Sequence, residues 1–271
     1  MLSYIEKHQG YEFTKSESFY CGDAAGRPAT ANSKKDHSAD DLKFASNIKV
    51  KFHTPESLFL GQPMTGVQSK LVFTLKQPET KSKEAVNQVL ETAGCVIKNG
   101  KPGDELLLTK DRPLEVIIFV GSPGSGKSTF WKTYFSSYER VNNDTLKTPA
   151  KCLKACSEFL AQKKSVVIDN TNSTKHTRRS YLQLCSELDV PARCIFFSAD
   201  KKVCMHNNFM RKVNTYRKHL SGSVPAIALH IFFKNLEVPT REEGFEAVIE
   251  VQFVLKFEND QDRECYEQMQ M

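Results

Sequence analysis

From residue 113 onward, two patterns of hydrophobic and polar positions alternate along the chain. Short runs of consecutive hydrophobic residues are typical of strands buried on both faces, and they occur at 114–120, around 140–141, and at 165–169 and 192–198. Between them, hydrophobic residues recur near helical spacing, which predicts helices over 127–138, 149–162, 174–188 and 201–218. Strands that alternate with helices favour parallel pairing, because each crossover must return across the sheet. This part of the chain is therefore expected to be an α/β domain with a parallel sheet and helices on both faces.

The first 112 residues follow a less regular pattern. Residues 1–65 are polar and rich in turn-forming residues. Residues 66–112 predict a connector that contains a strand at 71–75 and a helix at 84–93. The expected organisation is thus 1–65, a connector at 66–112 and an α/β domain at 113–271.

The first strand of the α/β domain leads directly into a glycine-rich segment of the P-loop type. Glycines let backbone amides approach phosphate oxygens, and the helix expected to begin near Lys127 favours bound anions. We expect Lys127 to reach the β- and γ-phosphates of ATP and Ser128 to ligate Mg²⁺. A chance match of the fixed positions arises in about one such chain in a hundred, and the flanking strand and helix lower that further. The predicted nucleotide-binding residues are Gly121, Ser122, Pro123, Gly124, Ser125, Gly126, Lys127, Ser128 and Thr129.

Two aspartates follow predicted strands, where α/β sheets bind their ligands. Asp169 ends the strand at 165–169 and is placed to hold Mg²⁺ opposite Ser128, the alternative being a helix N-cap. Asp144 follows a short strand that we expect one strand from the P-loop, where a catalytic base would accept the proton of an attacking hydroxyl. A cap for the helix near 149 explains Asp144 equally well.

Basic residues concentrate in two predicted helices. The helix at 201–218 carries six lysines and arginines and no acidic residue. A solvated face is the common explanation of such a run, but in a P-loop kinase an arginine there neutralises the transferred phosphate, and Arg211 is the candidate. Lys175, Arg178 and Arg179 follow Asp169 and are candidates to meet a polyanionic acceptor.

Composition narrows the picture only modestly. The net charge of +6 is compatible with an anionic partner without requiring one. Scattered cysteines suggest a reducing compartment, with Cys152 and Cys156 packing on one helix face rather than binding metal, and the histidines lack ligand spacing. No apolar run approaches the roughly 20 residues that span a bilayer, and residues 1–7 do not begin a signal peptide. We expect a cytoplasmic or nuclear protein without membrane contact, in which Trp131 packs in the core.

These motifs together resemble a known family. The segment 115–255 resembles the kinase domain of the polynucleotide kinase 3′-phosphatase family, most specifically through Asp-Asn-Thr-Asn at 169–172 and Glu-Gly-Phe at 243–245. Residues 1–65 resemble the end of that family's phosphatase domain, of the haloacid dehalogenase type. The matching residues there include Gly-Asp-Ala-Ala-Gly-Arg-Pro-Ala at 22–29 and Lys-Lys-Asp at 34–36. The fold implied is a P-loop kinase preceded by a partial haloacid dehalogenase-like α/β remnant.

The resemblance implies transfer of the γ-phosphate of ATP to a 5′-hydroxyl of DNA, or of RNA. It makes Asp144 the general base, Asp169 the carboxylate on the Mg²⁺ side and Asp23 the Mg²⁺ ligand of the phosphatase remnant. It also implies a nuclear role in the repair of strand breaks.

The chain departs from the family pattern at several positions. The family's arginine before the base is Asn143, a lid arginine is replaced at Phe209, and a family Tyr-Arg-Lys reads Phe-Phe-Lys at 232–234. Residues 1–22 contain no aspartate, so the Asp-x-Asp-Gly-Thr motif of the phosphatase is missing. We therefore expect these 271 residues not to hydrolyse 3′-phosphates, as either a truncated form or an incomplete gene model. The alternatives for the kinase part are a non-catalytic nucleotide- and DNA-binding module, and a P-loop kinase of another hydroxyl acceptor.

Overall fold

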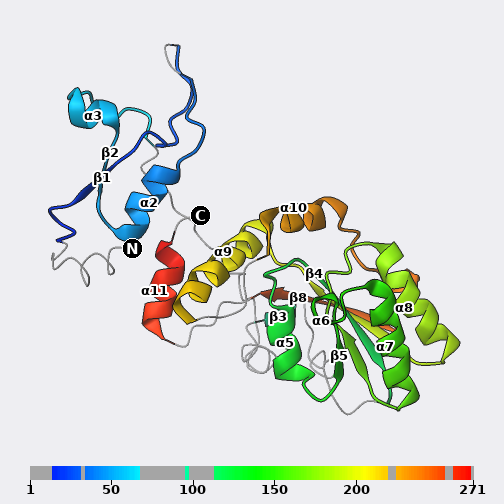
Figure 1. The fold of residues 1–271 in the computed structure, drawn as a ribbon. Coiled ribbons are helices and arrows are strands. Elements are labelled where there is room, and N and C mark those ends of the chain that lie inside the picture. Colours follow the sequence, from blue (N-terminus) through cyan, green and yellow to red (C-terminus); the bar gives the residue numbers. More distant parts are fainter. Residues whose placement is uncertain are drawn as a thin grey trace. The chain divides into compact units, whose positions relative to one another are not determined.

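A computed structural model describes residues 14–31, 34–67, 95–97, 113–218, 224–253 and 259–269. The chain divides into two compact units, Met1–Leu75 with Phe257–Met271 and Lys76–Lys256 (Figure 1). The strand expected at 71–75 and the helix expected at 84–93 lie outside the described residues.

Within the described part of the chain, the larger unit is built on a six-stranded sheet of order β3-β8-β7-β4-β6-β5. All neighbouring strands from β8 to β5 pair in parallel, whereas β3 adds an antiparallel edge beside β8. The parallel α/β sheet expected from the sequence is confirmed, and β3 shows that part of 66–112 joins it. The bounds are Cys95–Ile97 for β3, Val116–Gly121 for β4, Glu139–Val141 for β5, Val166–Ile168 for β6, Ala192–Phe197 for β7 and Ala247–Phe253 for β8.

Helices flank this sheet on both faces (Figure 1). Their bounds are Lys127–Tyr134 for α5, Asn143–Leu146 for α6, Pro149–Ala161 for α7, Lys175–Glu187 for α8, Lys201–Lys218 for α9, Ala226–Asn235 for α10 and Arg241–Glu243 for the 3-10 helix η2. The helix expected at 127–138 is too long by about a turn. It ends at Tyr134, because a tight turn closed by the bond from Tyr138 N–H to Phe135 O already leads into β5.

Alternation along β4 separates two hydrophobic cores. Ile117 and Phe119 pack on one face with Phe130 of α5. Val116, Ile118 and Val120 pack on the other face with α7 and α8. Cys152 and Cys156 of α7 lie in the second core, so the prediction that they serve packing is confirmed. With β4 buried on both faces, the loop at its carboxyl end starts from a rigid position.

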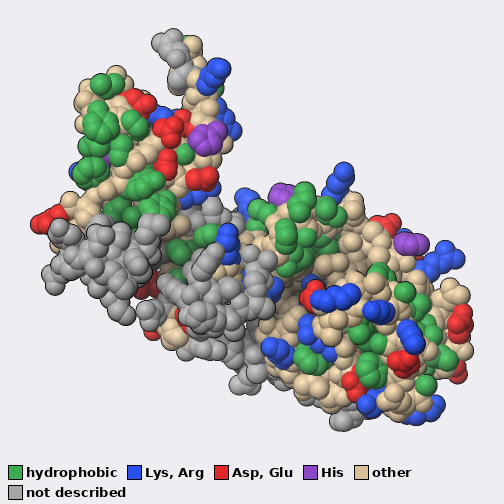
Figure 2. Space-filling view, viewed as in Figure 1, with side chains coloured by type: hydrophobic (Ala, Val, Ile, Leu, Met, Phe, Trp, Pro, Cys, Tyr) green, Lys and Arg blue, Asp and Glu red, His purple; other side chains and the backbone are tan. Residues whose placement is uncertain are grey.

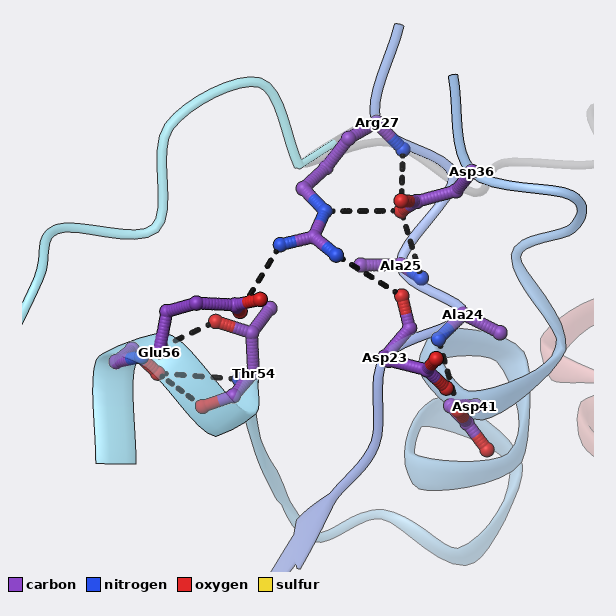
Figure 3. A network of polar contacts seen from close by, with 9 residues as sticks. Asp23, Ala24, Ala25, Arg27, Asp36, Asp41, Thr54 and Glu56 are labelled. Carbon is purple, nitrogen blue, oxygen red and sulfur yellow. Dashed lines mark hydrogen bonds and ion pairs between the residues drawn. The ribbon is translucent and has the colours of Figure 1, made fainter. Parts of the chain in front are cut away.

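The smaller unit contains two parallel strands, β1 (Phe19–Cys21) and β2 (Lys51–His53). Its described helices are α2 (Asp40–Ile48), α3 (Pro55–Phe59) and α11 (Asp260–Gln268). Figure 3 shows Arg27 between two carboxylates: Nε bonds Asp36 at 2.9 Å and Nη1 bonds Glu56 at 3.0 Å. The hydrogen bond from Arg27 lowers the pKa of Asp36 below its usual value. This network ties the segment around Asp36 to the start of α3.

The surface of the larger unit is uneven in character. Figure 2 shows hydrophobic side chains gathered over α10, where Ile227 and Ile231 are exposed. It also shows Lys and Arg side chains gathered over α6 and the nearby part of α7, where Lys147 and Lys151 are exposed. Among the described residues, no helix is both long enough and apolar enough to cross a bilayer.

Candidate active site

The glycine-rich loop at the end of β4 adopts a conformation that suits only glycine at two positions. Gly124 and Gly126 have φ values of +80° and +94°. A Cβ on Gly124 would also lie 2.7 Å from the carbonyl oxygen of Cys204 in α9. Asn207 of α9 donates from its side-chain amide to Gly124 O at 2.7 Å. The helix predicted to act as a lid therefore packs directly against the loop.

Lys127 is buried at the start of α5. Its ammonium group donates to Gly121 O at 2.8 Å and to Ser122 O at 2.7 Å. Burial lowers the pKa of Lys127 to about 8, against the opposing charge of Asp169, while the positive charge of Arg211 lowers it further. A desolvated ammonium group gains strongly from an anionic ligand, because the ligand restores the favourable interactions that burial removed.

The loop leaves hydrogen-bond donors available to phosphate oxygens. Ser125 Oγ is buried and has no hydrogen-bond partner, and a Cβ on Gly121 would intrude to 2.7 Å from it. No side chain caps the amino end of α5, so its first amides remain available to an anion. The donors present are those that hold a nucleotide's phosphates in other P-loops.

Ser128 and Asp169 are brought together as the sequence predicts. Ser128 Oγ donates to Asp169 Oδ2 at 3.0 Å, and the Asp169 side chain is only 2% exposed. The cap of α8 is Thr174, so the alternative of Asp169 as an N-cap is wrong. Hydroxyl and carboxylate oxygens are the ligands that Mg²⁺ prefers, and the guanidinium of Arg140 already lies against both, so this position accommodates a cation.

Asp144 lies in the first turn of α6, just after β5. It caps no helix, because Asn142 caps α6 and Thr148 caps α7. The prediction that its strand lies one strand from the P-loop is wrong, since β6 pairs between β4 and β5. All three strands are parallel, so Asp144 still lies at the same edge of the sheet, and its charge acts on the pKa of Lys127, for which burial is the dominant cause. The side chain of Asp144 is exposed at this edge.

A cavity of about 350 Å³ lies beside this edge, between α7 and α8. Asn143 and Asn170 both line it, and the Asn143 N–H donates to Asn170 Oδ1 at 2.7 Å. Sequence reasoning noticed the Asp-Asn-Thr-Asn motif but assigned no task to Asn170. The cavity is lined by Asn143, Pro149, Ala150, Leu153, Asn170, Thr171, Asn172, His176, Thr177, Ser180 and Tyr181.

The basic residues after Asp169 separate into two kinds. Arg178 is fully buried and bonds Glu243 at 2.7 and 2.6 Å, so the prediction that it meets an acceptor is wrong. Its guanidinium instead ties α8 to η2. Lys175 and Arg179 are exposed, and their proposed role stays a prediction.

Asp23 of the smaller unit lies beside Asp41 (Figure 3). Its neighbour Asp41 accepts from Ala24 N–H at 2.9 Å, and Asp36 accepts from Arg27, so both carboxylates are used within the fold (Figure 3). Over the described ranges, no group of three or more His, Cys, Asp or Glu side chains lies close enough to hold a metal ion. The role of Asp23 as a Mg²⁺ ligand stays a prediction.

Comparison with known proteins matches two segments of the chain to protein-family models. Residues 1–59 match the model of the family described as polynucleotide kinase 3 phosphatase, and residues 147–224 match that of an AAA domain. A bifunctional polynucleotide phosphatase/kinase of Schizosaccharomyces pombe is 38% identical over 236 residues, which cover 86% of this chain and 51% of that protein. A protein of corresponding description from Acanthamoeba polyphaga mimivirus is 35% identical over 253 residues, covering 88% of this chain and 56% of its own length.

A further match is shorter. A polynucleotide 3′-phosphatase of Saccharomyces cerevisiae is 54% identical over 43 residues, or 16% of each chain. The chain spans about half the length of the two longer relatives. The resemblance to this family is confirmed: over most of its length, the chain is a relative of the bifunctional polynucleotide phosphatase/kinases, with a short phosphatase-like part and a P-loop kinase-type domain.

Proposed function

We propose that the chain is an ATP-dependent polynucleotide 5′-hydroxyl kinase. The observation that carries the proposal is the convergence of Lys127, the Ser128–Asp169 pair and Asp144 at one edge of the sheet. The relatives' names, which pair a phosphatase with a kinase, support the same reaction.

Each residue has one task in this reaction. The ammonium group of Lys127 neutralises the charge of the β- and γ-phosphates held by the loop. Ser128 and Asp169 would hold Mg²⁺, which would neutralise charge on the phosphate oxygens. Asp144 takes the proton of the 5′-hydroxyl as the hydroxyl oxygen forms a bond to the γ-phosphorus. The bond between the γ-phosphorus and the oxygen that bridges it to the β-phosphate breaks, and ADP leaves. Arg211 in α9 stabilises the charge of the transferred group.

The cavity beside Asn143 and Asn170 suits the terminal nucleoside of the acceptor. Its volume of about 350 Å³ is in the range of small-molecule sites, and two amide side chains supply directional hydrogen bonds. The exposed Lys147 and Lys151 near Asp144 favour the phosphates of the following nucleotides (Figure 2).

The family resemblance further supports DNA ends as the acceptor, strand-break repair as the process and the nucleus as the location. A fluorescent fusion that stays outside the nucleus before and after DNA breakage would contradict the location without touching the chemistry.

The reaction is tested with ATP labelled at the γ-phosphate. Acceptors are a 5′-hydroxyl DNA oligonucleotide, the same oligonucleotide with a 5′-phosphate, its RNA counterpart and a free nucleoside. Label is expected on the 5′-hydroxyl oligonucleotide and absent from the phosphorylated one. Nucleotide and DNA binding without transfer would establish the non-catalytic alternative, and equal labelling of the nucleoside would establish a kinase of another acceptor.

A further inference from the structure

Arg140, on β5, contacts both of the residues that we expect to hold Mg²⁺. Its Nε donates to Asp169 Oδ2 at 2.8 Å, and its Nη2 donates to the same oxygen. Nη2 also lies 3.0 Å from Ser128 Oγ. The guanidinium therefore lies against the two oxygens that the metal would use.

Charge explains why a cation is held there. Asp169 is a carboxylate with a side chain only 2% exposed, and such a group needs a counter-charge in contact. Lys127 does not supply that contact, because its ammonium group bonds the carbonyl oxygens of Gly121 and Ser122. Among the described residues, Asp169 forms its ion pair with Arg140.

We propose that Arg140 is the resident cation of the metal position and competes with Mg²⁺ for Ser128 Oγ and Asp169 Oδ2, an inference that rests on the proposed function. Two cations repel at this separation, and the guanidinium uses oxygen lone pairs that a metal ion requires. Arg140 can leave without unpacking the core, since 28% of its side chain is already exposed. Free metal is therefore bound weakly, and metal binding is favoured only when a triphosphate adds its own oxygens.

The chain carries a built-in reporter of this exchange. The guanidinium carbon of Arg140 lies 5.0 Å from the centre of the Trp131 ring, and Trp131 is the only tryptophan. A cation over an indole ring perturbs its electronic environment. Displacement of Arg140 is therefore expected to change the fluorescence of Trp131.

A matched control is Lys164, which lies between α7 and β6 and pairs with a residue of the same strand as Arg140. Lys164 pairs with Glu139 at 2.7 Å and lies 5.8 Å from the ring of Phe159, so it reproduces both kinds of contact away from Ser128 and Asp169. The variant Lys164→Gln removes a comparable cation without touching the metal position.

The test is titration of the full chain with Mg²⁺ alone, and with Mn²⁺ alone, in the absence of nucleotide. Metal affinity is measured by calorimetry in wild type, Arg140→Gln, Arg140→Lys and Lys164→Gln. We expect Arg140→Gln to bind metal about tenfold or more tightly than wild type, because a competing charged hydrogen bond is gone. The metal affinity of Arg140→Lys is expected to lie between those of wild type and Arg140→Gln. The metal affinity of Lys164→Gln is expected to match that of wild type. Saturating metal should change Trp131 emission in wild type and change it less in Arg140→Gln.

Equal or weaker metal binding by Arg140→Gln overturns the proposal, as does an equal gain in Lys164→Gln. If circular dichroism shows that Arg140→Gln does not fold, the test uses Arg140→Lys instead. A metal affinity of Arg140→Lys equal to that of wild type then overturns the proposal. Failure of the proposed function is distinguishable, because it appears as absent γ-phosphate transfer by wild type, which a titration without nucleotide does not measure.

Discussion

The hydroxyl of Ser128 donates a 3.0 Å hydrogen bond to Asp169, 41 residues further along the chain. The contact follows from parallel pairing of β4 with β6, in which Ile118 lies opposite Ile168. Each strand ends at the same edge, so the residues that follow them meet there. Asp169 is fixed further by donation from its own N–H to Val141 O on β5. The site is thus a product of strand order, and three strands must pair correctly to form it.

Lys127→Ala is expected to lower nucleotide affinity about tenfold or more and to abolish phosphate transfer. The ammonium group is the buried cation of the loop, and charged hydrogen bonds to a ligand are among the strongest available. Binding of a fluorescent ATP analogue measures the affinity. The control is Lys132→Ala, an exposed lysine in the last turn of the same helix. Unchanged ATP binding in Lys127→Ala would remove the loop from the mechanism.

Filling the cavity between α7 and α8 is expected to weaken binding of the acceptor without changing binding of ATP. Ala150 lines this cavity, so Ala150→Phe places a ring where we propose the terminal nucleoside binds. The KM for a 5′-hydroxyl oligonucleotide should rise about tenfold as favourable contacts are lost, while affinity for ATP stays the same. Ala161→Phe, at the exposed far end of α7, serves as the control. Equal KM values in the two variants would place the acceptor elsewhere.

The parts of this fold that depend on local pattern could be predicted. The strand before the loop, the helix at Lys201–Lys218 and the parallel sheet all follow from periodicity and from the alternation of strands and helices. The P-loop was equally clear, because glycine is needed where φ is positive, as at Gly124 and Gly126.

The parts of the fold that depend on strand order and on residues distant in sequence could not be predicted. Nothing local indicates that β6 inserts between β4 and β5, or that β3 pairs antiparallel with β8. The burial of Arg178 depends on Glu243, which follows it by 65 residues. A role for Arg140 could not be predicted either, because its partners, Ser128 and Asp169, become neighbours only after the sheet assembles.

Breaking a buried ion pair at the opposite end of β4 is expected to destabilise the larger unit. Arg193 bonds Glu115 at 2.7 and 2.6 Å, both are buried, and Tyr138 adds a bond to Glu115 at 2.8 Å. Arg193→Met leaves the carboxylate buried without its guanidinium, which costs about 3–5 kcal/mol of unfolding free energy. Urea denaturation followed by Trp131 fluorescence measures the loss.

The control for that measurement is Lys164→Gln, which removes an exposed pair with Glu139 and should cost about 1 kcal/mol or less. A loss of the same small size in Arg193→Met would show that the buried pair contributes little.

The smaller unit is expected to show a pH-dependent contribution from Asp36. Hydrogen bonding to Arg27 lowers the pKa of Asp36 below its ordinary value of 3.8. The stabilisation is therefore fully present above pH 3.8 and is lost as the pH falls through the lowered pKa of the folded protein. Asp36→Asn should speed hydrogen exchange of the Arg27 amide, which donates to Asp36, at neutral pH.

Well below pH 3.8 the exchange rates of wild type and Asp36→Asn should converge, because the wild-type carboxyl is then also neutral. Asp40→Asn, which removes an exposed carboxylate, provides the comparison. A difference between wild type and Asp36→Asn that persists unchanged in acid would mean that charge is not its cause.

In the proposed reaction, Asp144 takes the proton of a 5′-hydroxyl as the γ-phosphate is transferred. The most direct measurement is the single-turnover rate of transfer from labelled ATP to a 5′-hydroxyl oligonucleotide by Asp144→Asn, compared with Asp189→Asn. Asp189 is a suitable control because it lies in the turn after α8 with φ of +52°, which asparagine also adopts. We expect a fall of about 10²-fold or more for Asp144→Asn, with ATP binding intact, and no change for Asp189→Asn. A wild-type rate in Asp144→Asn would contradict this expectation.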